Sequence, residues 1–186
     1  MFLGDATGHG IGAAFMTMMV GTGLDSIGPA APVEETLTRL HHLIHERTTD
    51  RFVTGIYARI SPAGLLVHGS AGHPPIVYVP RGARPRLLDG EAGFPLGLLE
   101  PPLPFGPYRE QLQPGDRLYL YTDGLLEWLR PDGQQFALER ALRCLEERRD
   151  DPLQASVDGL VAAAREFAAG APPTDDVTVI GLEYRG

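Results

Sequence analysis

Short strand-like blocks broken by proline and glycine constrain the fold of this chain more than any other feature. They lie at 51–60, 64–72 and 75–80, and the first and third are rich in β-branched or aromatic residues. Blocks this close together are typical of strands that pair antiparallel through short turns. Further strand-like blocks follow at 117–122 and 176–184. The sequence therefore predicts antiparallel sheet structure.

Helical patterns lie on both sides of the strand blocks. Residues 10–27 have apolar residues at helical spacing with small residues between them, which predicts a buried helix whose methionines pack in a core. The apolar positions of that segment are Ile11, Ala14, Phe15, Met18 and Met19. Residues 33–47 predict an amphipathic helix with acids in its first turn, and 135–148 and 153–169 predict two more helices. Because the helices cluster between antiparallel strand runs, we expect an α+β layered fold.

Length and composition limit the domain organisation and the partners. With 186 residues and 43% hydrophobic content, the chain can bury one sizeable core, so we expect a single domain over 1–186. A formal charge of −8 without a basic cluster argues against nucleic-acid binding. The single cysteine, Cys144, excludes a disulfide framework within one chain. No apolar run approaches the roughly 20 residues of a membrane helix, so we expect a soluble protein. The single cysteine fits a reducing, cytoplasmic setting.

Short acids recur beside the expected strand ends. Asp123 follows the block "LYLYT" and precedes Gly124. Asp5 follows the first strand-like residues, and Asp175 and Asp176 open the last strand-like block. Such an Asp is often turn chemistry, because Asp caps local backbone donors and glycine adopts positive φ. The recurrence also fits a hard-cation site, since Mg²⁺ and Mn²⁺ prefer carboxylate and water oxygens. Spacing alone leaves both interpretations open.

Six ordered blocks of the chain resemble one family. They are "GDATGHGIGAAFMT" (4–17), "RFVTGIYARI" (51–60), "GSAGHPPIVYVPRG" (69–82), "PLGLLE" (95–100), "PGDRLYLYTDGLLE" (114–127) and "TDDVTVIGLE" (174–183). In order and spacing they resemble the SpoIIE-type phosphatases, the bacterial branch of the metal-dependent PPM serine/threonine phosphatases. The resemblance covers nearly the whole chain and implies an α-β-β-α sandwich, in which two antiparallel sheets are flanked by helices.

The resemblance also implies roles for the acids. Asp5 resembles the acid of the family's Asp-x-x-Gly-His-Gly block, and Asp123 resembles that of Tyr-Thr-Asp-Gly. Asp175 resembles the metal acid ahead of the final strand, with Asp176 beside it as a further candidate ligand. Asp5, Asp123 and Asp175 are therefore the expected catalytic and metal-ligating residues for two Mn²⁺ or Mg²⁺ ions. Metal-activated water would attack phosphorus directly, so Cys144 is expected to be a buried helix residue and no nucleophile.

Residues next to these acids are supporting candidates. Gly8, His9 and Gly10 predict either a backbone that cradles phosphate at a helix N-terminus or a tight strand-to-helix turn. Glu127 and Gly124 are expected to support the neighbouring acid, although Glu127 also fits a plain turn.

The remaining histidines are expected to be structural. His73 precedes Pro74, which favours extended backbone and a structural role in a hairpin over a role as a proton donor. His41, His42 and His45 lie at helical spacing without a matching acid trio, and we expect a solvated or partly buried helix face there.

The function implied by the resemblance is hydrolysis of phosphoserine or phosphothreonine on a regulatory protein. The implied substrate is an anti-sigma-factor antagonist of a bacterial partner-switching pathway. Family members carry upstream strands and a Gly-Gly-Asp block, whereas four residues precede Asp5 here, so we expect an N-terminally incomplete domain. A fragment of a longer protein, an edge completed by a partner chain and a non-catalytic member all fit. The intact appearance of the other blocks favours a fragment.

Two classes of function stay open at this point. The first is the metal-dependent phosphatase, and the alternative is a catalytically impaired domain that acts as a protein-binding or regulatory module. An uncovered sheet edge also predicts a homodimer or contact with an upstream sensor domain. No nucleic-acid or membrane partner is expected.

Overall fold

The computed structural model describes residues 1–48, 51–100 and 104–186. Its contacts divide the chain into two compact units. Unit 1 consists of Met1–Ser61, Leu65–His73 and Asp89–Glu110, and unit 2 of Pro62–Gly64, Pro74–Leu88 and Gln111–Gly186. The expectation of a single domain over 1–186 stays a prediction.

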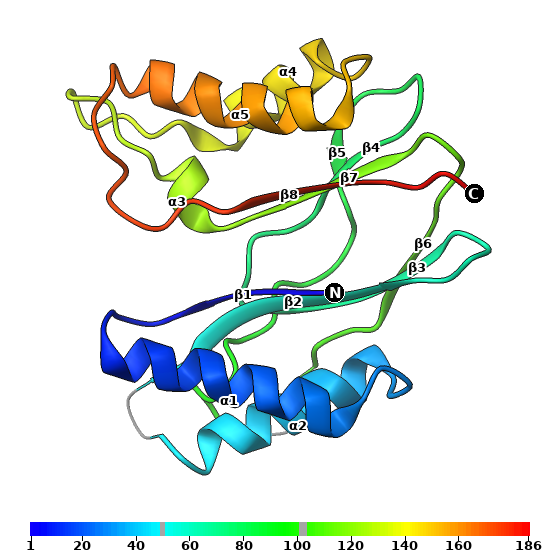
Figure 1. Cartoon of the computed structure of the whole chain (residues 1–186), viewed down its shortest axis with the longest axis vertical. Coiled ribbons are helices and arrows are strands. Elements are labelled where there is room, and N and C mark those ends of the chain that lie inside the picture. The colour runs from blue at the N-terminus through cyan, green and yellow to red at the C-terminus, as the bar shows by residue number, and fades with distance from the viewer. Residues whose placement is uncertain (49–50, 101–103) are drawn as a thin grey trace. The chain divides into compact units, whose positions relative to one another are not determined.

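Unit 1 is built on a four-stranded sheet with the order β1-β2-β3-β6 (Figure 1). The strands are β1 (Phe2–Ala6), β2 (Val53–Ile60), β3 (Leu65–Ala71) and β6 (Tyr108–Gln111). β1 pairs antiparallel with β2, and Asp5 lies opposite Thr54. β2 pairs antiparallel with β3, and Tyr57 lies opposite Gly69. The predicted strands at 51–60 and 64–72 are confirmed.

Two helices pack on this sheet, α1 (Ile11–Ile27) and α2 (Val33–His45). α2 is amphipathic as predicted, because it buries one row of apolar residues and leaves Glu34 and Glu35 in solvent. The core beneath the two helices consists of Met16, Val20, Val33, Leu37, Leu40, Ile44, Val53, Tyr57, Ala71, Leu96 and Phe105.

The prediction that the apolar residues of 10–27 form a buried helix is wrong for one face. The side chains of Ile11, Phe15 and Met18 are 79%, 58% and 60% exposed. These three residues are called the apolar face of α1 below. The helix instead buries Met16, Val20 and Gly23, which lie on the opposite side at a spacing of 3.6 residues per turn. Because α1 is apolar all round, its sequence pattern could not indicate which face is buried.

Unit 2 has a second four-stranded sheet with the order β5-β4-β7-β8. Its strands are β5 (Arg86–Leu87), β4 (Val77–Val79), β7 (Arg117–Tyr121) and β8 (Val179–Glu183), and neighbouring strands pair antiparallel. The strands predicted at 75–80 and 117–122 are confirmed with shorter bounds. The closing strand begins at Val179 and not at Asp176, so the two acids lie in the loop before it.

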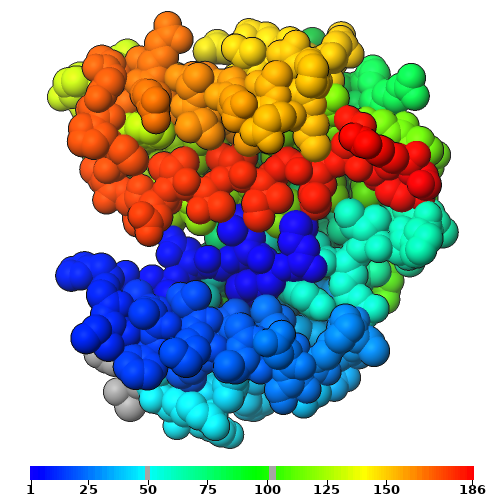
Figure 2. Space-filling view, viewed as in Figure 1, coloured from blue at the N-terminus to red at the C-terminus, as the bar shows by residue number. Residues whose placement is uncertain are grey.

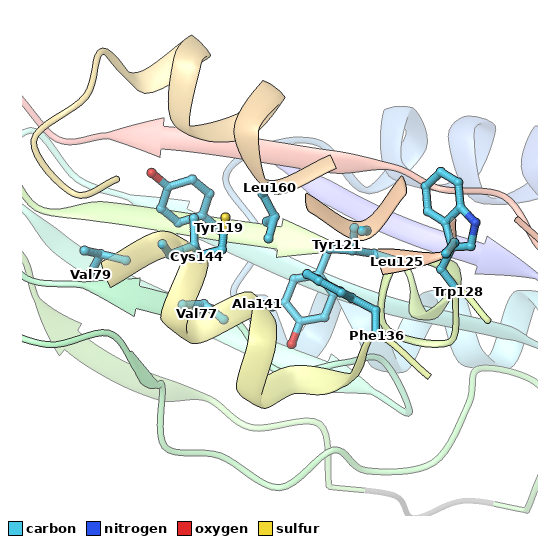
Figure 3. Close-up of a cluster of buried hydrophobic side chains, with 13 residues drawn as sticks. Val77, Val79, Tyr119, Tyr121, Leu125, Trp128, Phe136, Ala141, Cys144 and Leu160 are labelled. Carbon is cyan, nitrogen blue, oxygen red and sulfur yellow. The ribbon is translucent and has the colours of Figure 1, made fainter. Parts of the chain in front are cut away.

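Three helices accompany this second sheet, α3 (Asp123–Leu126), α4 (Ala137–Glu147) and α5 (Leu153–Phe167). Tyr119 and Tyr121 of β7 pack with residues of these helices in a buried cluster (Figure 3). Cys144 of α4 is buried in that cluster, with its Sγ 3.7 Å from the Gly159 carbonyl oxygen, as expected of a structural cysteine.

Two antiparallel sheets with flanking helices confirm the predicted fold class. Among the described residues, no helix is both long and apolar enough to cross a membrane.

Candidate metal centre

In unit 1, Asp5 lies near the end of β1, where the chain turns towards α1. Asp5 is half-buried and lies opposite Thr54 of β2. Two residues later Thr7 is bound to the neighbouring chain, because its N–H and hydroxyl both donate to the Phe52 carbonyl at 3.1 and 3.0 Å. The Phe52 N–H donates in return to Thr7 Oγ1 at 3.1 Å. These three bonds fix the backbone that carries Asp5.

The segment from Gly8 to Gly10 is a tight turn from strand to helix. Gly8 and Gly10 have φ angles of 83° and 73°, a region that favours glycine. His9 between them is exposed, and α1 begins at Ile11 without a side-chain cap from any described residue. The turn is therefore established, and phosphate binding by its N–H groups stays a prediction.

Arg51 lies against this turn, which the sequence did not indicate. Its Nη1 donates to the Thr7 carbonyl oxygen at 3.4 Å. A Cβ atom on Gly12 would lie 2.4 Å from Arg51 Cζ, so glycine at that position leaves the space that the guanidinium occupies. The quoted block "RFVTGIYARI" contains this arginine, but only the β1–β2 register shows that it reaches the residues after Asp5. A fixed positive charge thus accompanies Asp5 in unit 1.

In unit 2, Thr122 connects the end of β7 to the loop before β8. Its N–H donates to the Thr178 carbonyl at 3.1 Å, and its hydroxyl donates to the Asp176 carbonyl at 2.8 Å. The same hydroxyl accepts the Thr178 N–H at 2.9 Å. Asp123 follows at once as the first residue of α3. Thr122 therefore sets the position of Asp123 relative to the loop that carries Asp175.

Gly124 allows the loop that carries Asp175 and Asp176 to lie close to the start of α3. A Cβ atom at residue 124 would lie 2.5 Å from the Asp176 carbonyl oxygen, closer than real Cβ contacts allow. Carboxylate oxygens of Asp123 and Asp175 consequently come within 4.8 Å of each other, although 51 intervening residues separate them in sequence. Asp175 is also ordered locally, since its Oδ1 accepts the Asp176 N–H at 2.8 Å.

The Asp123–Asp175 pair suits a hard divalent cation. Both carboxylates are exposed, and each offers an oxygen at a spacing that one ion can bridge with modest side-chain rotation, at roughly 2.1 Å from each oxygen for Mg²⁺. Two like charges this close repel, and a cation between them offsets that repulsion by attracting both carboxylates. The chemistry of the donors therefore fits Mg²⁺ or Mn²⁺.

The other acids expected near Asp123 are placed differently. The Asp176 side chain is exposed and stands outside the carboxylate group formed by Asp123 and Asp175. Glu127 is exposed too, and its N–H donates to the Asp123 carbonyl at 2.9 Å, which makes it part of the α3 turn. Their proposed contribution to a metal site stays a prediction.

Histidines of unit 1 have structural contacts. His73 is buried, its Nδ1 lies 3.1 Å from Thr54 Oγ1, and its carbonyl accepts the Ser70 hydroxyl at 3.2 Å. Of the three histidines in α2, His42 is exposed and His45 is half-buried, as expected of a partly buried face. His41 differs because it is 1% exposed.

Comparison with known proteins identifies the kind of domain. A family model described as Stage II sporulation protein E (SpoIIE) matches residues 1–185. None of the curated proteins matches the chain. The SiaA PP2C domain of Pseudomonas aeruginosa has 21% identity and a TM-score of 0.82, over 98% of this chain and 73% of that chain.

Three further solved structures have the same fold. The RsbU and RsbW domains of a Mycobacterium tuberculosis protein match with 24% identity and a TM-score of 0.82, over 99% of this chain and 51% of that one. The PP2C phosphatase domain of SpoIIE from Bacillus subtilis, with a fragment of its regulatory domain, matches with 20% identity and a TM-score of 0.75, over 98% and 53%. A manganese-presoaked form of the SpoIIE phosphatase domain matches with 16% identity and a TM-score of 0.61, over 91% and 73%. The chain thus spans about half of two of these proteins.

Proposed function

Because the chain belongs to the SpoIIE family of PP2C-type phosphatases, we propose that it hydrolyses phosphoserine or phosphothreonine on a regulatory protein with Mn²⁺ or Mg²⁺. Family membership supports phosphatase function in general. The observation that carries the proposal is the approach of the Asp123 and Asp175 carboxylates to within 4.8 Å of each other. A fixed pair of exposed acids of this kind has no partner cation among the described side chains and suits a metal.

Asp123 and Asp175 would hold the metal, with Asp176 as an auxiliary acid. For Asp5, the proposal of a metal-binding role rests on its resemblance to the acid of the family's Asp-x-x-Gly-His-Gly block. When bound, divalent ions supply a water of lowered pKa and neutralise charge on the phosphoryl oxygens. The acids hold and orient these ions. The N–H groups of the Gly8–Gly10 turn, aided by Arg51, would bind phosphate oxygens through hydrogen bonds and charge.

For the substrate, we propose a phosphorylated anti-sigma-factor antagonist in a cytoplasmic partner-switching pathway. The support comes from relatives, since one similar structure joins an RsbU domain to an RsbW domain in one protein. The formal charge of −8 argues against a polyanionic macromolecule as the partner.

Phosphate release measures this function directly. The 186-residue chain should release phosphate from p-nitrophenyl phosphate and from a phosphoserine peptide in the presence of Mn²⁺, and not in metal-free buffer. Asp123→Asn and Asp175→Asn should each lower kcat by at least about 100-fold, because metal catalysis supplies several kcal/mol. Asp25→Asn changes an exposed acid of α1 and should retain activity. Full activity in Asp123→Asn would refute the assignment.

The alternative, a protein-binding or regulatory module, is favoured by the apolar face of α1. Ile11, Phe15 and Met18 expose contiguous apolar surface, which in soluble proteins often marks a contact with another protein.

Metal-dependent stability separates the two functions. If Asp123 and Asp175 bind Mn²⁺ in the folded state only, millimolar Mn²⁺ should raise Tm in the wild type and not in Asp123→Asn. A folded chain without any Mn²⁺-dependent change in Tm and without phosphate release would favour the binding module.

A further inference from the structure

A polar cavity of about 340 Å³ opens in unit 2 at the end of the sheet where β7 begins. Figure 2 shows the segments that surround it, namely the turn after β4 in green, the connection from α4 to α5 in yellow and the C-terminal segment in red. The charged side chains in its wall are Arg81, Arg117, Arg149, Asp150 and Glu183. This set is called the arginine pocket below.

Arg117 is the fixed part of the arginine pocket. Its side chain is only 12% exposed, its Nε contacts Glu183 Oε2 at 3.0 Å, and its Nη1 donates to the Arg149 carbonyl at 3.0 Å. Glu183 is also 3.5 Å from Arg185 Nε, so two guanidinium groups share its charge. The half-buried acid of the wall, Glu183, is therefore already neutralised.

Arg81 and Arg149 supply charge that the wall does not balance. The Arg149 Nε lies 3.6 Å from Asp150, whose side chain is 93% exposed, and such surface pairs contribute little. The Arg81 N–H is held by Asp116 Oδ1 at 2.8 Å, whereas its guanidinium has no ion pair with any residue that the structure describes. Three arginines against two acids leave a charge of +1 in the wall of a chain whose formal charge is −8.

Gly115 leaves the space that the Arg81 side chain occupies. Its φ is 95°, and a Cβ atom there would lie 2.8 Å from Arg81 Cδ. A larger residue would push the Arg81 stem out of its place in the wall. The backbone thus permits the arginine to lie along the cavity.

We propose that the arginine pocket binds a small polyanion that carries phosphate or carboxylate groups. Guanidinium groups present paired N–H donors that match two oxygens of such groups. The cavity volume lies at the lower end of the range of small-molecule sites.

The arginine pocket is separate from the proposed reaction centre. It contains Arg117, the first residue of β7, whereas Asp123 lies two residues beyond the last residue of that strand. At about 3.3 Å per residue, the two residues are roughly 20 Å apart. The polyanion should therefore bind without a metal and without a reaction.

Binding of pyrophosphate to the intact, metal-free chain tests the proposal. Isothermal titration at constant ionic strength should give saturable 1:1 binding. Citrate, titrated in the same way, distinguishes carboxylate from phosphate recognition. Binding of both ligands shows general polyanion recognition, and binding of one alone identifies the preferred group.

Single substitutions locate the site. Arg81→Ala and Arg149→Ala should each weaken binding about tenfold, because each removes charge-assisted hydrogen bonds from an exposed side chain. Arg143→Ala removes an exposed arginine of α4 outside the pocket and should leave the affinity unchanged. Asp150→Asn should strengthen binding severalfold, since it removes the acid beside Arg149, whereas Glu147→Gln should not.

Either of two results would overturn the proposal. The first is the absence of saturable binding by both ligands to the folded wild type. The second is an equal loss of affinity in Arg143→Ala and Arg81→Ala, which would indicate general charge attraction.

Discussion

His41 and His45 bind the two polar backbone groups of one residue, Gly97. The Gly97 N–H donates to His41 Nδ1 at 3.1 Å, and His45 Nδ1 lies 3.2 Å from the Gly97 carbonyl oxygen. The two rings are stacked, with centroids 5.6 Å apart and planes at 13°. The segment around Gly97 is thereby attached to α2, and Leu96 in turn exchanges backbone hydrogen bonds with Val53.

The two rings require opposite protonation states, which predicts a pH dependence. His45 faces the Gly97 carbonyl and, through Nε2 at 3.1 Å, the Glu100 carboxylate, and both are acceptors, so both bonds need a protonated ring. These two bonds raise the pKa of His45 above 6.5, and Glu46 adds to the effect. Burial, together with His42 and His45, lowers the pKa of His41, which accepts a hydrogen bond only when its Nδ1 is unprotonated.

Stability should therefore decline on both sides of pH 6.5. The His45 contribution is complete below pH 6.5 and is lost as pH rises through its raised pKa. The His41 contribution is complete above pH 6.5 and is lost as pH falls through its lowered pKa. Glu100→Gln should flatten the alkaline decline and lower the pKa of His45 in an NMR titration, and Glu91→Gln, an exposed control, should not. An unchanged His45 pKa in Glu100→Gln would show that the contact is not formed in solution.

Gly124→Ala should disturb the Asp123–Asp175 pair without changing either acid. The new Cβ would meet the Asp176 carbonyl oxygen at 2.5 Å, so the loop must move. We expect a loss of about 1–3 kcal/mol in the free energy of unfolding and loss of the Mn²⁺-dependent rise in Tm. Gly21→Ala lies in an open position of α1 and should stabilise the chain by about 0.5–1 kcal/mol. Equal Tm values for Gly124→Ala and the wild type would contradict this account.

Two tyrosines of β7 should respond differently to loss of their hydroxyl groups. Tyr119 Oη is 2.6 Å from Ser156 Oγ, whereas Tyr121 Oη is buried without a hydrogen-bond partner among the described residues. Tyr119→Phe should cost about 1 kcal/mol, and Tyr121→Phe should be neutral or stabilising by up to about 1 kcal/mol. Chemical denaturation of both variants measures the difference, and a larger loss in Tyr121→Phe would show that its hydroxyl has a partner.

The burial of Tyr121 also predicts how the stability of the fold changes at alkaline pH. Burial raises its pKa to about 12. Because the unfolded chain ionises this tyrosine near pH 10, its contribution to stability is lost as pH rises from 10 to 12. Tyr121→Phe should lose less stability over that interval than the wild type.

The apolar face of α1 predicts self-association. Light scattering at micromolar concentration should show a dimer or larger species, and Phe15→Ser should shift it towards monomer, because Phe15 is 58% exposed. Leu98→Ser, which changes a 45% exposed residue elsewhere in unit 1, serves as the control. A monomeric wild type would argue against both this face and the edge of β1 as contacts between copies.

The sequence predicted most strands and helices, because their signals are local, but it did not predict the short elements β5, β6 and α3. Alternating apolar residues and breaks at proline and glycine defined β2, β3 and β7 within a few residues. The buried face of α1 was not predictable, since an all-apolar helix has no pattern to distinguish its two sides. The burial of His41 was not predictable either. Its Nδ1 accepts a hydrogen bond from the N–H of Gly97, which lies 56 residues away in sequence.

The candidate site was predictable in part. The acids could be named from their blocks, but the approach of Asp123 to Asp175 depends on Thr122, whose hydrogen bonds reach residues 54 and 56 positions further along the chain. Arg51 was missed because its contact with Thr7 follows from the β1–β2 register and from the space at Gly12.

A single oxygen atom, the hydroxyl of Thr122, thus holds the end of β7 and the loop before β8 in the register that brings Asp123 close to Asp175. Relatives in which serine replaces this threonine would keep both hydrogen bonds, whereas relatives with valine or alanine there would retain every acid and still hold the acids out of alignment. A count of metal-binding acids would misclassify such relatives as intact, so the hydroxyl before the acid is the better marker of a working site.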